Sequence, residues 1–190
     1  EADKKLADEA AAKKLADEDD AKKEAEMQKR WMEYSIPGTY HEYLMPLVGQ
    51  WDTSTKFWMM NQPDPIVSLG ISTIEWVMGG RYLEEYTESD FMGNSFQGRG
   101  ILSYDNYLKQ YQSIWFDSMG TGVSSSQGVC DESGKTLTFK GKMVEPGMQT
   151  IFDTRAVLHI KNYTEHTFEF YLLSPEGKEF KLFEIGYKRK

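Results

Sequence analysis

The stretch Thr136-Leu137-Thr138-Phe139-Lys140-Gly141-Lys142-Met143 alternates between polar residues and residues that are apolar or small. A period of two is typical of a β-strand with one face on a core and the other in water, because successive side chains point to opposite faces. Similar stretches, separated by turn residues such as Gly, Asn, Asp and Pro, continue from Trp51 to Tyr187 with almost no helical break. The pattern predicts a mainly β protein.

The number of such stretches predicts the architecture. About ten strands fit into the run, which is in the range where a barrel encloses a small-ligand cavity. An antiparallel sheet of this length is expected to curl and close on itself. We therefore predict a closed or nearly closed antiparallel β-barrel of about ten strands.

The N-terminal segment differs in composition. Residues 1–34 begin with a run of Ala, Lys, Asp and Glu, which favours an α-helix, and Leu6 and Leu15 are the only large apolar residues before Met27. Such a helix buries little surface. We predict a charged helix or spacer over residues 1–34 and a β-barrel domain over residues 35–190. A helix of this kind is either a solvated spacer or a tether that holds the barrel off a surface or mediates self-association into a homo-oligomer.

Charge and hydropathy exclude several classes of partner. The net charge of −8 argues against a nucleic acid or an anionic membrane surface, since both need a basic face. No apolar stretch approaches the ~18–20 residues of a membrane-spanning helix. Cys130 is the only cysteine, so no intrachain disulfide is expected. The chain starts at Glu1 rather than Met, so an exported or periplasmic location after signal removal is plausible, while a cytoplasmic one stays open.

Three residues at the ends of the strand run carry a first resemblance. Gly49-x-Trp51 on the first strand and Arg189 at the end of the last resemble the signature of the calycin (lipocalin-like) superfamily. In that superfamily the indole closes one end of the barrel and the arginine stacks over it. A guanidinium on an indole face gains cation–π energy of about 1 kcal/mol when partly desolvated.

A second resemblance covers roughly residues 40–190. The chain resembles a bacterial family of uncharacterised proteins, domain of unknown function 1579. The resemblance implies a calycin-type barrel and no established activity. The motifs that carry it are, in order, Gly49-x-Trp51, Trp76-Val77-Met78-Gly79-Gly80-Arg81-Tyr82-Leu83, Phe96-x-Gly98-x-Gly100, Tyr104-Asp105-Asn106, Tyr111-x-x-x-Trp115-x-Asp117-Ser118-Met119 and Tyr187-x-Arg189.

Aromatic residues make up 14% of the chain and fall on both faces of several strands. This excess favours a carrier or sensor that binds a small apolar or amphipathic molecule inside the barrel. Arg81 and Asp117 are the candidates for fixing a polar group, as a buried ion pair if the strands bring them together. The candidates for the wall of the ligand-binding site are Trp58, Trp76, Tyr104 and Trp115.

Two other functional hypotheses stay open. The first is an enzyme on the same fold, with Asp117 or Glu85 as acid or base. The second is a structural or interaction protein that acts through its N-terminal helix.

We expect neither a metal nor a cofactor. The three histidines lack the spacing of a zinc site, and His159 is predicted to point outward from its strand. A lone histidine could ligate haem, but Asp52-Thr53-Ser54-Thr55 replaces the Gly-x-Gly stretch of nitrobindin-like barrels after Trp51, so haem is not expected. Gly98-x-Gly100 is interpreted as a place for barrel curvature or for close packing under a tryptophan ring.

Overall fold

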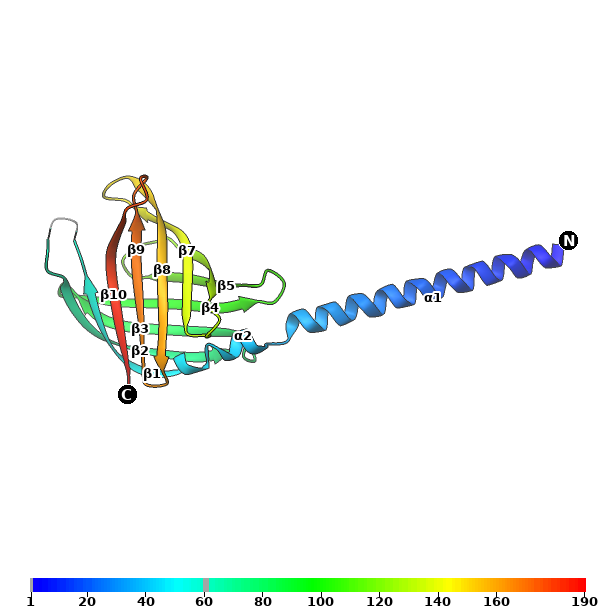
Figure 1. The fold of residues 1–190 in the computed structure, drawn as a ribbon, viewed down its shortest axis with the longest axis horizontal. Coiled ribbons are helices and arrows are strands. Elements are labelled where there is room, and N and C mark those ends of the chain that lie inside the picture. The colour runs from blue at the N-terminus through cyan, green and yellow to red at the C-terminus, as the bar shows by residue number, and fades with distance from the viewer. Residues whose placement is uncertain (1, 60–61) are drawn as a thin grey trace. The chain divides into compact units, whose positions relative to one another are not determined.

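The computed structural model describes residues 2–59 and 62–190, so residue 1 of the predicted helix and residues 60 and 61 of the predicted strand run lie outside the described residues. The chain divides into two compact units, Glu1–Ile36 and Pro37–Lys190. The first is a helix and the second is a barrel (Figure 1).

The first unit is the helix α1, Ala2–Ser35. Ion pairs one turn apart support it, such as Lys23 with Asp19 at 3.3 Å and Arg30 with Glu26 at 3.1 Å. Leu6 and Leu15 are each 67% exposed. The helix ends before Pro37, whose ring disfavours the helical conformation of the preceding residue. The predicted N-terminal helix is confirmed. Within the described part of the chain, none of the helices is long and apolar enough to span a membrane.

The second unit begins with two short helices that lie against one end of the barrel. They are the α-helix α2, Thr39–Glu42, and the 3-10 helix η1, Met45–Leu47. Leu44 and Leu47 are buried in the core there, and the Tyr111 hydroxyl donates to the Tyr40 carbonyl at 2.8 Å. This segment therefore packs over the barrel end that holds Trp51.

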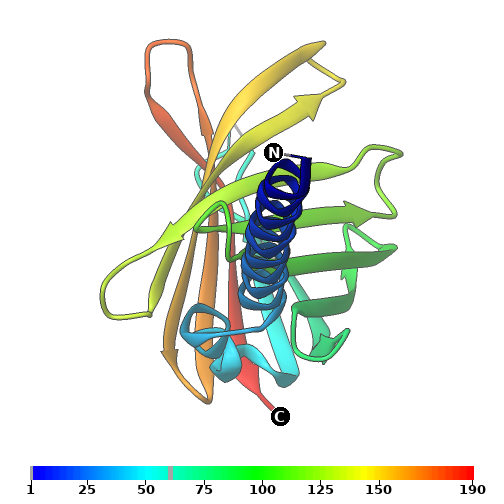
Figure 2. The ribbon, with the colours of Figure 1, turned by 90° about the vertical axis from the view of Figure 1, so that its right-hand side faces the viewer.

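Ten antiparallel strands form a closed barrel in the order β1-β10-β9-β8-β7-β6-β5-β4-β3-β2, which confirms the predicted fold class. In Figure 1, β8–β10 cross β3–β5 at a steep angle. Figure 2 shows the same ribbon turned by 90° about the vertical axis. The strands are β1 (Gly49–Phe57), β2 (Ile66–Val77), β3 (Tyr82–Phe91), β4 (Asn94–Asp105), β5 (Gln110–Asp117), β6 (Ser124–Cys130), β7 (Thr136–Glu145), β8 (Thr150–Asn162), β9 (Glu165–Leu173) and β10 (Glu179–Arg189).

Pairing of the first strand with the last closes the barrel, with Trp51 opposite Arg189. Trp51 is fully buried, and its indole N–H donates to the Leu47 carbonyl at 2.8 Å. The Arg189 guanidinium lies 4.4 Å from the centre of the Trp51 ring. The end of the barrel at Trp51 is therefore filled by side chains.

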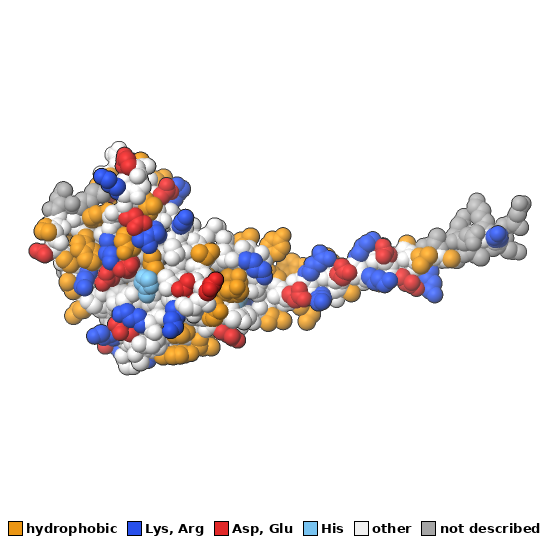
Figure 3. Space-filling model, in the orientation of Figure 1, with side chains coloured by type: hydrophobic (Ala, Val, Ile, Leu, Met, Phe, Trp, Pro, Cys, Tyr) orange, Lys and Arg blue, Asp and Glu red, His pale blue; other side chains and the backbone are white. Residues whose placement is uncertain are grey.

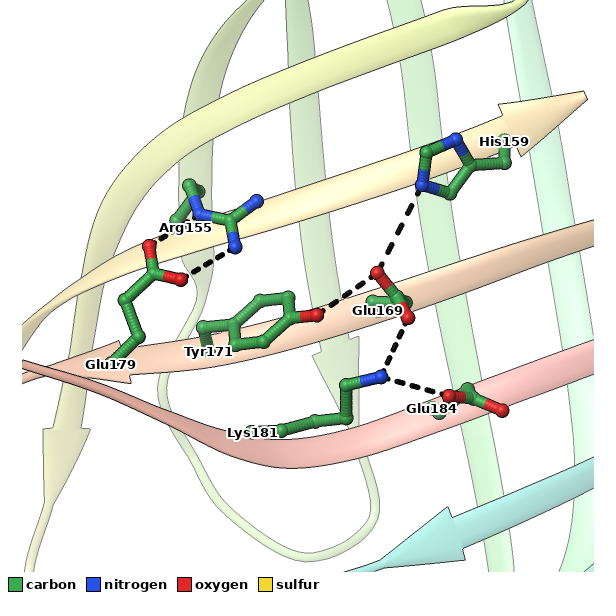
Figure 4. Close-up of polar contacts among 7 residues, drawn as sticks. All are labelled: Arg155, His159, Glu169, Tyr171, Glu179, Lys181 and Glu184. Atoms are coloured by element: carbon green, nitrogen blue, oxygen red, sulfur yellow. Dashed lines mark hydrogen bonds and ion pairs between the residues drawn. The ribbon is translucent and has the colours of Figure 1, made fainter.

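The outer face of β8–β10 carries interleaved basic and acidic side chains (Figure 3). Lys181 binds Glu169 at 2.6 Å and Glu184 at 2.9 Å, and the Tyr171 hydroxyl donates to Glu169 at 3.0 Å (Figure 4). His159 lies 3.9 Å from Glu169 in the same network, so the prediction that it points outward is confirmed. This network belongs to the outer surface and leaves the interior to other residues.

Candidate binding site in the barrel interior

The inward direction of each strand follows from alternation and from the buried residues. Starting from buried Trp51, the register places Ser72, Thr87, Gly98 and Asp117 on the same inner ring. Away from the Trp51 end, several inward side chains are half-buried rather than buried. Inward side chains that stay partly exposed indicate that water reaches them from inside the barrel.

An apolar wall lies on β9 and β10. Phe168, Phe170 and Ile185 pack against the buried core, and all three are half-buried. The rings of Phe170 and Phe183 stack with centroids 4.9 Å apart and planes 2° apart. This wall presents a continuous aromatic surface to the interior.

A carboxyl group lies on β3, across the interior from this wall and near the end that Trp51 fills. Oε1 of Glu85, on β3, accepts hydrogen bonds from the Ser72 hydroxyl at 2.7 Å and the Tyr187 hydroxyl at 3.1 Å. Its other oxygen, Oε2, has no hydrogen-bond partner among the residues that the structure describes. Burial raises the pKa of Glu85 above its usual value, although both hydrogen bonds act in the opposite direction.

His166 lies beside Tyr187, one of the two residues that donate a hydrogen bond to Glu85. His166 is 2% exposed, stacks on Tyr187 with centroids 4.1 Å apart, and meets the edge of Trp51 at 4.3 Å. Its Nδ1 is buried and has no hydrogen-bond partner in the described part of the chain. Burial, and then the charge of Arg189, lower the pKa of His166 to about 3. The ring is therefore neutral at physiological pH and supplies no positive charge to this part of the interior.

Trp115 and Asp117 lie on the wall formed by β4 and β5. A Cβ atom placed on Gly98 would lie 2.3 Å from Trp115 Cζ2, and one on Gly100 would lie 3.1 Å from Cε3. The ring therefore lies flat on the β4 backbone, as predicted for Gly98-x-Gly100, with its other face toward the interior. The indole N–H donates to Asp117 Oδ2 at 2.7 Å, and Oδ1 accepts from the Met119 N–H at 2.9 Å.

The structure separates the predicted ligand pair. Arg81 is exposed in the turn before β3 and donates to the Met78 carbonyl at 3.1 Å. It adjoins Tyr82, which pairs with Ser103, whereas Asp117 pairs with Gly98 five residues further along β4. The buried Arg81–Asp117 ion pair suggested from the sequence therefore does not form. Both oxygens of Asp117 already accept hydrogen bonds, so the structure gives no support to its use as a base.

The predicted wall tryptophans other than Trp115 lie in different surroundings. Trp76 points inward from β2 and packs against the core. Trp58 follows β1, and Lys181 Nζ, which belongs to the outer network, lies 5.8 Å from its ring centroid. Tyr104 is buried and stacks on Tyr40 at 4.4 Å. A role in ligand binding stays a prediction for each of them.

Sequence reasoning missed the apolar wall and the partners of Glu85. The alternation of His166, Phe168 and Phe170 was the signal for the β9 part of the wall. Ser72 and Tyr187 gave no such signal, because their contacts with Glu85 join three strands that only the register brings together.

Two hollows lie elsewhere. One, of about 460 Å³, is lined by Tyr40, Tyr104, Lys109, Tyr111, Val129 and Cys130, and burial together with Asp131 raises the pKa of the Cys130 thiol. The other, of about 540 Å³, crosses the strands β5–β7.

Among the described residues, no group of three His, Cys, Asp or Glu side chains could hold a metal ion. The unpartnered carboxyl oxygen of Glu85 therefore makes the interior the candidate site.

These features define a calycin-like β-barrel whose interior has an aromatic wall and a buried carboxyl group. The chain belongs to the family described as "Protein of unknown function (DUF1579)", whose sequence model matches residues 36–189. No curated protein matches the chain.

The chain is also similar to solved structures, and one of them shows the same kind of fold. The crystal structure of Rv2717c from M. tuberculosis is similar with a TM-score of 0.59 and 11% identity, over 82% of this chain and 99% of that one. At this identity the likeness shows the fold alone. A redesigned beta barrel has a TM-score of 0.39 and 13% identity, over 78% of this chain and 95% of that one.

Proposed function

We propose that the barrel binds a small amphipathic molecule in its interior. The observation that carries the proposal is the pairing of half-buried aromatic side chains with an unpartnered carboxyl oxygen inside one closed barrel. Binding sites for small molecules are mostly apolar, with a few placed polar groups that fix orientation. The stacked rings of Phe170 and Phe183 would contact the apolar part of the ligand.

The partial exposure of these rings supports ligand binding rather than a filled core. Aromatic residues in a core without space are as buried as Trp51 and Tyr111, which are at most 1% exposed. The β9–β10 wall keeps exposed surface although it faces inward. An apolar ligand would remove that surface from water and would gain about 25 cal/mol for each Å² buried.

Two measurements test this function. Native mass spectrometry of the purified protein would show any molecule that co-purifies with it. Titration with a neutral environment-sensitive dye such as Nile red would show whether the interior accepts an apolar molecule. We expect binding with a blue shift and enhanced dye fluorescence. A protein that carries no small molecule and does not bind the dye would contradict the proposal.

A matched pair of variants tests whether the dye binds inside the barrel. Thr55 points inward from β1 opposite Ile185, and Leu69 points outward from the neighbouring strand β2 and is 71% exposed; neither lines the two hollows described above. Thr55→Phe should weaken dye binding by filling interior space, whereas Leu69→Phe should leave it unchanged. Circular dichroism would check that both variants fold, since overpacking costs about 1–3 kcal/mol. Equal effects of the two variants would place the dye outside the barrel.

A further inference from the structure

The walls of the barrel interior differ in chemical character. Glu85, Trp115 and Asp117 lie on β3 to β5, while Phe168, Phe170, Phe183 and Ile185 lie on β9 and β10. In the closed strand order, β6–β8 separate β5 from β9 on one side, and β1 and β2 separate β3 from β10 on the other. The acidic wall and the phenylalanine wall therefore face each other across the barrel.

The charge of the interior has one sign. The described lysines and arginines of the strands point outward or lie at the strand ends: Lys56 pairs with Glu184, Arg99 with Glu84, and Lys142 with Asp153. Arg155 pairs with Glu179 and Lys181 with Glu169 on the outer face (Figure 4). Arg189 lies over the Trp51 ring at the closed end. No cationic side chain of the described residues therefore faces Glu85 from inside the barrel.

We infer that the ligand is an amphiphile with a cationic, ammonium-type head group, held by the Glu85 carboxylate and the inner face of Trp115, with its apolar tail on the phenylalanine wall. This inference rests on the proposed function. Glu85 Oε2 is an unpartnered acceptor, and an ammonium group supplies hydrogen-bond donors together with the missing positive charge.

The position of Trp115 suits the same head group. A Cβ atom on Gly100 would lie 3.1 Å from the Trp115 ring and 3.7 Å from the Cβ of Glu85, so the indole and this side chain are neighbours on the wall. An indole face attracts cations more strongly than other aromatic rings do. Asp117 accepts a hydrogen bond from the indole N–H of Trp115 and adds a second negative charge near the ring. An anionic head group would meet only repulsion there.

Three amphiphiles with the same tail test the choice of head group. Dodecylamine, dodecanol and dodecanoate would be titrated calorimetrically into the full chain near neutral pH, below the concentrations at which they aggregate. We expect dodecylamine to bind at least about tenfold more tightly than dodecanoate, as a charge-assisted hydrogen bond would produce. Dodecanoate binding as tightly as dodecylamine would overturn the inference, and this comparison needs no variant.

A matched pair of variants tests the residue. Glu85→Gln should weaken dodecylamine binding about tenfold while leaving dodecanol unchanged. Glu84→Gln, at the adjacent outward position that pairs with Arg99, should leave both unchanged. Unchanged dodecylamine binding by Glu85→Gln would overturn the assignment. If no amphiphile binds and Nile red does not bind either, the proposed function itself fails, which is a different result from binding with the wrong head-group preference.

Discussion

The Arg189 guanidinium covers the Trp51 ring at 4.4 Å and at the same time donates to the carbonyls of Val48 at 2.8 Å and Pro46 at 3.0 Å. Its Nε donates to the carbonyl of Tyr163. One side chain at the end of the last strand thus holds the indole, the segment before the first strand and the β8–β9 turn. A planar guanidinium can make all these contacts together, and an ammonium group cannot.

Arg189→Lys should therefore destabilise the barrel although the charge is kept. We expect a loss of about 1–3 kcal/mol in the free energy of unfolding, measured by urea denaturation, because the partly buried carbonyls of Val48 and Pro46 lose charge-assisted hydrogen bonds. Lys188→Arg, at the neighbouring exposed position, is the control and should change stability little. Equal stability of the two variants would show that the stack over Trp51 contributes nothing measurable.

His166 should make the barrel sensitive to acid. Its pKa is lowered from 6.5 to about 3 in the folded protein, so the unfolded state takes up a proton first as the pH falls. Stability is fully present above pH 6.5 and decreases as the pH falls toward 3, by on the order of 4 kcal/mol. His166→Phe removes this term and also the unpartnered Nδ1.

The variant should therefore be more stable than the natural protein, and the difference between the two should grow as the pH falls through that window. Urea denaturation at a series of pH values measures it. His159→Phe, on the outer face, controls for the loss of a histidine and should keep the natural acid sensitivity. A difference that stays constant with pH would contradict the assignment of acid sensitivity to His166.

Glu85 should have the opposite pH dependence. Burial raises its pKa above 4.5 in the folded protein, so the unfolded carboxyl group ionises first as the pH rises. The contribution of Glu85 to stability is full below pH 4.5 and is lost as the pH rises toward the raised value. Glu85→Gln keeps an oxygen for Ser72 and Tyr187, so its stability relative to the natural protein should increase across this window. If the difference in the free energy of unfolding between Glu85→Gln and the natural protein does not change with pH, this assignment to Glu85 is contradicted.

On the outer face, Lys181 should stabilise the contact between β9 and β10. Burial alone would lower its pKa, but Glu169 and Glu184 outweigh burial and hold the pKa of Lys181 above its usual value. Lys181→Met leaves both carboxylates without this partner, and we expect a loss of about 1 kcal/mol that shrinks at high salt. Lys140→Met, at an exposed position of β7, is the control. A loss that does not depend on salt would point to packing against Trp58 and Tyr171 instead.

The fold could be predicted because alternation and turn residues are local signals. The stretch from Thr136 to Met143 shows its inner and outer faces without any knowledge of the partner strand. The candidate site could be predicted only in part. The register between β9 and β10 shifts between Lys181 and Phe183, so Phe180 and Phe183 do not follow a simple period of two. Such a shift depends on the pairing of strands, and the sequence of one strand does not reveal it.

The prediction of an Arg81–Asp117 ion pair was wrong for a similar reason. Asp117 lies on β5, and Arg81 directly precedes β3. The distance between them depends on the register with β4, where Tyr82, next to Arg81, pairs with Ser103, and Asp117 pairs with Gly98. For Gly98 and Gly100, in contrast, the sequence suggests either barrel curvature or packing under a tryptophan ring, because a ring that lies flat on a strand needs positions without a side chain. The pairing of β4 with β5 identifies that ring as Trp115.

That relationship between Trp115 and the two glycines gives a graded prediction. Gly98→Ala places a methyl group 2.3 Å from Trp115 Cζ2, so the ring must move and its hydrogen bond to Asp117 must break. We expect a loss of about 1–3 kcal/mol together with a change in tryptophan fluorescence. Gly100→Ala meets the ring at 3.1 Å and should cost less. Gly38→Ala, which meets no atom within 4 Å, is the control.

A double-mutant cycle separates this contact from an effect on the backbone. With Trp115→Leu as the background, Gly98→Ala should cost clearly less than in the natural protein, because the atoms that clash with the methyl group are gone. Urea denaturation of the four proteins gives the coupling energy between the two positions. If the cost of Gly98→Ala is the same in both backgrounds, the glycine is required by the strand itself. The indole face would then be free to tilt within the barrel, and the flat position that places it beside Glu85 would need another cause.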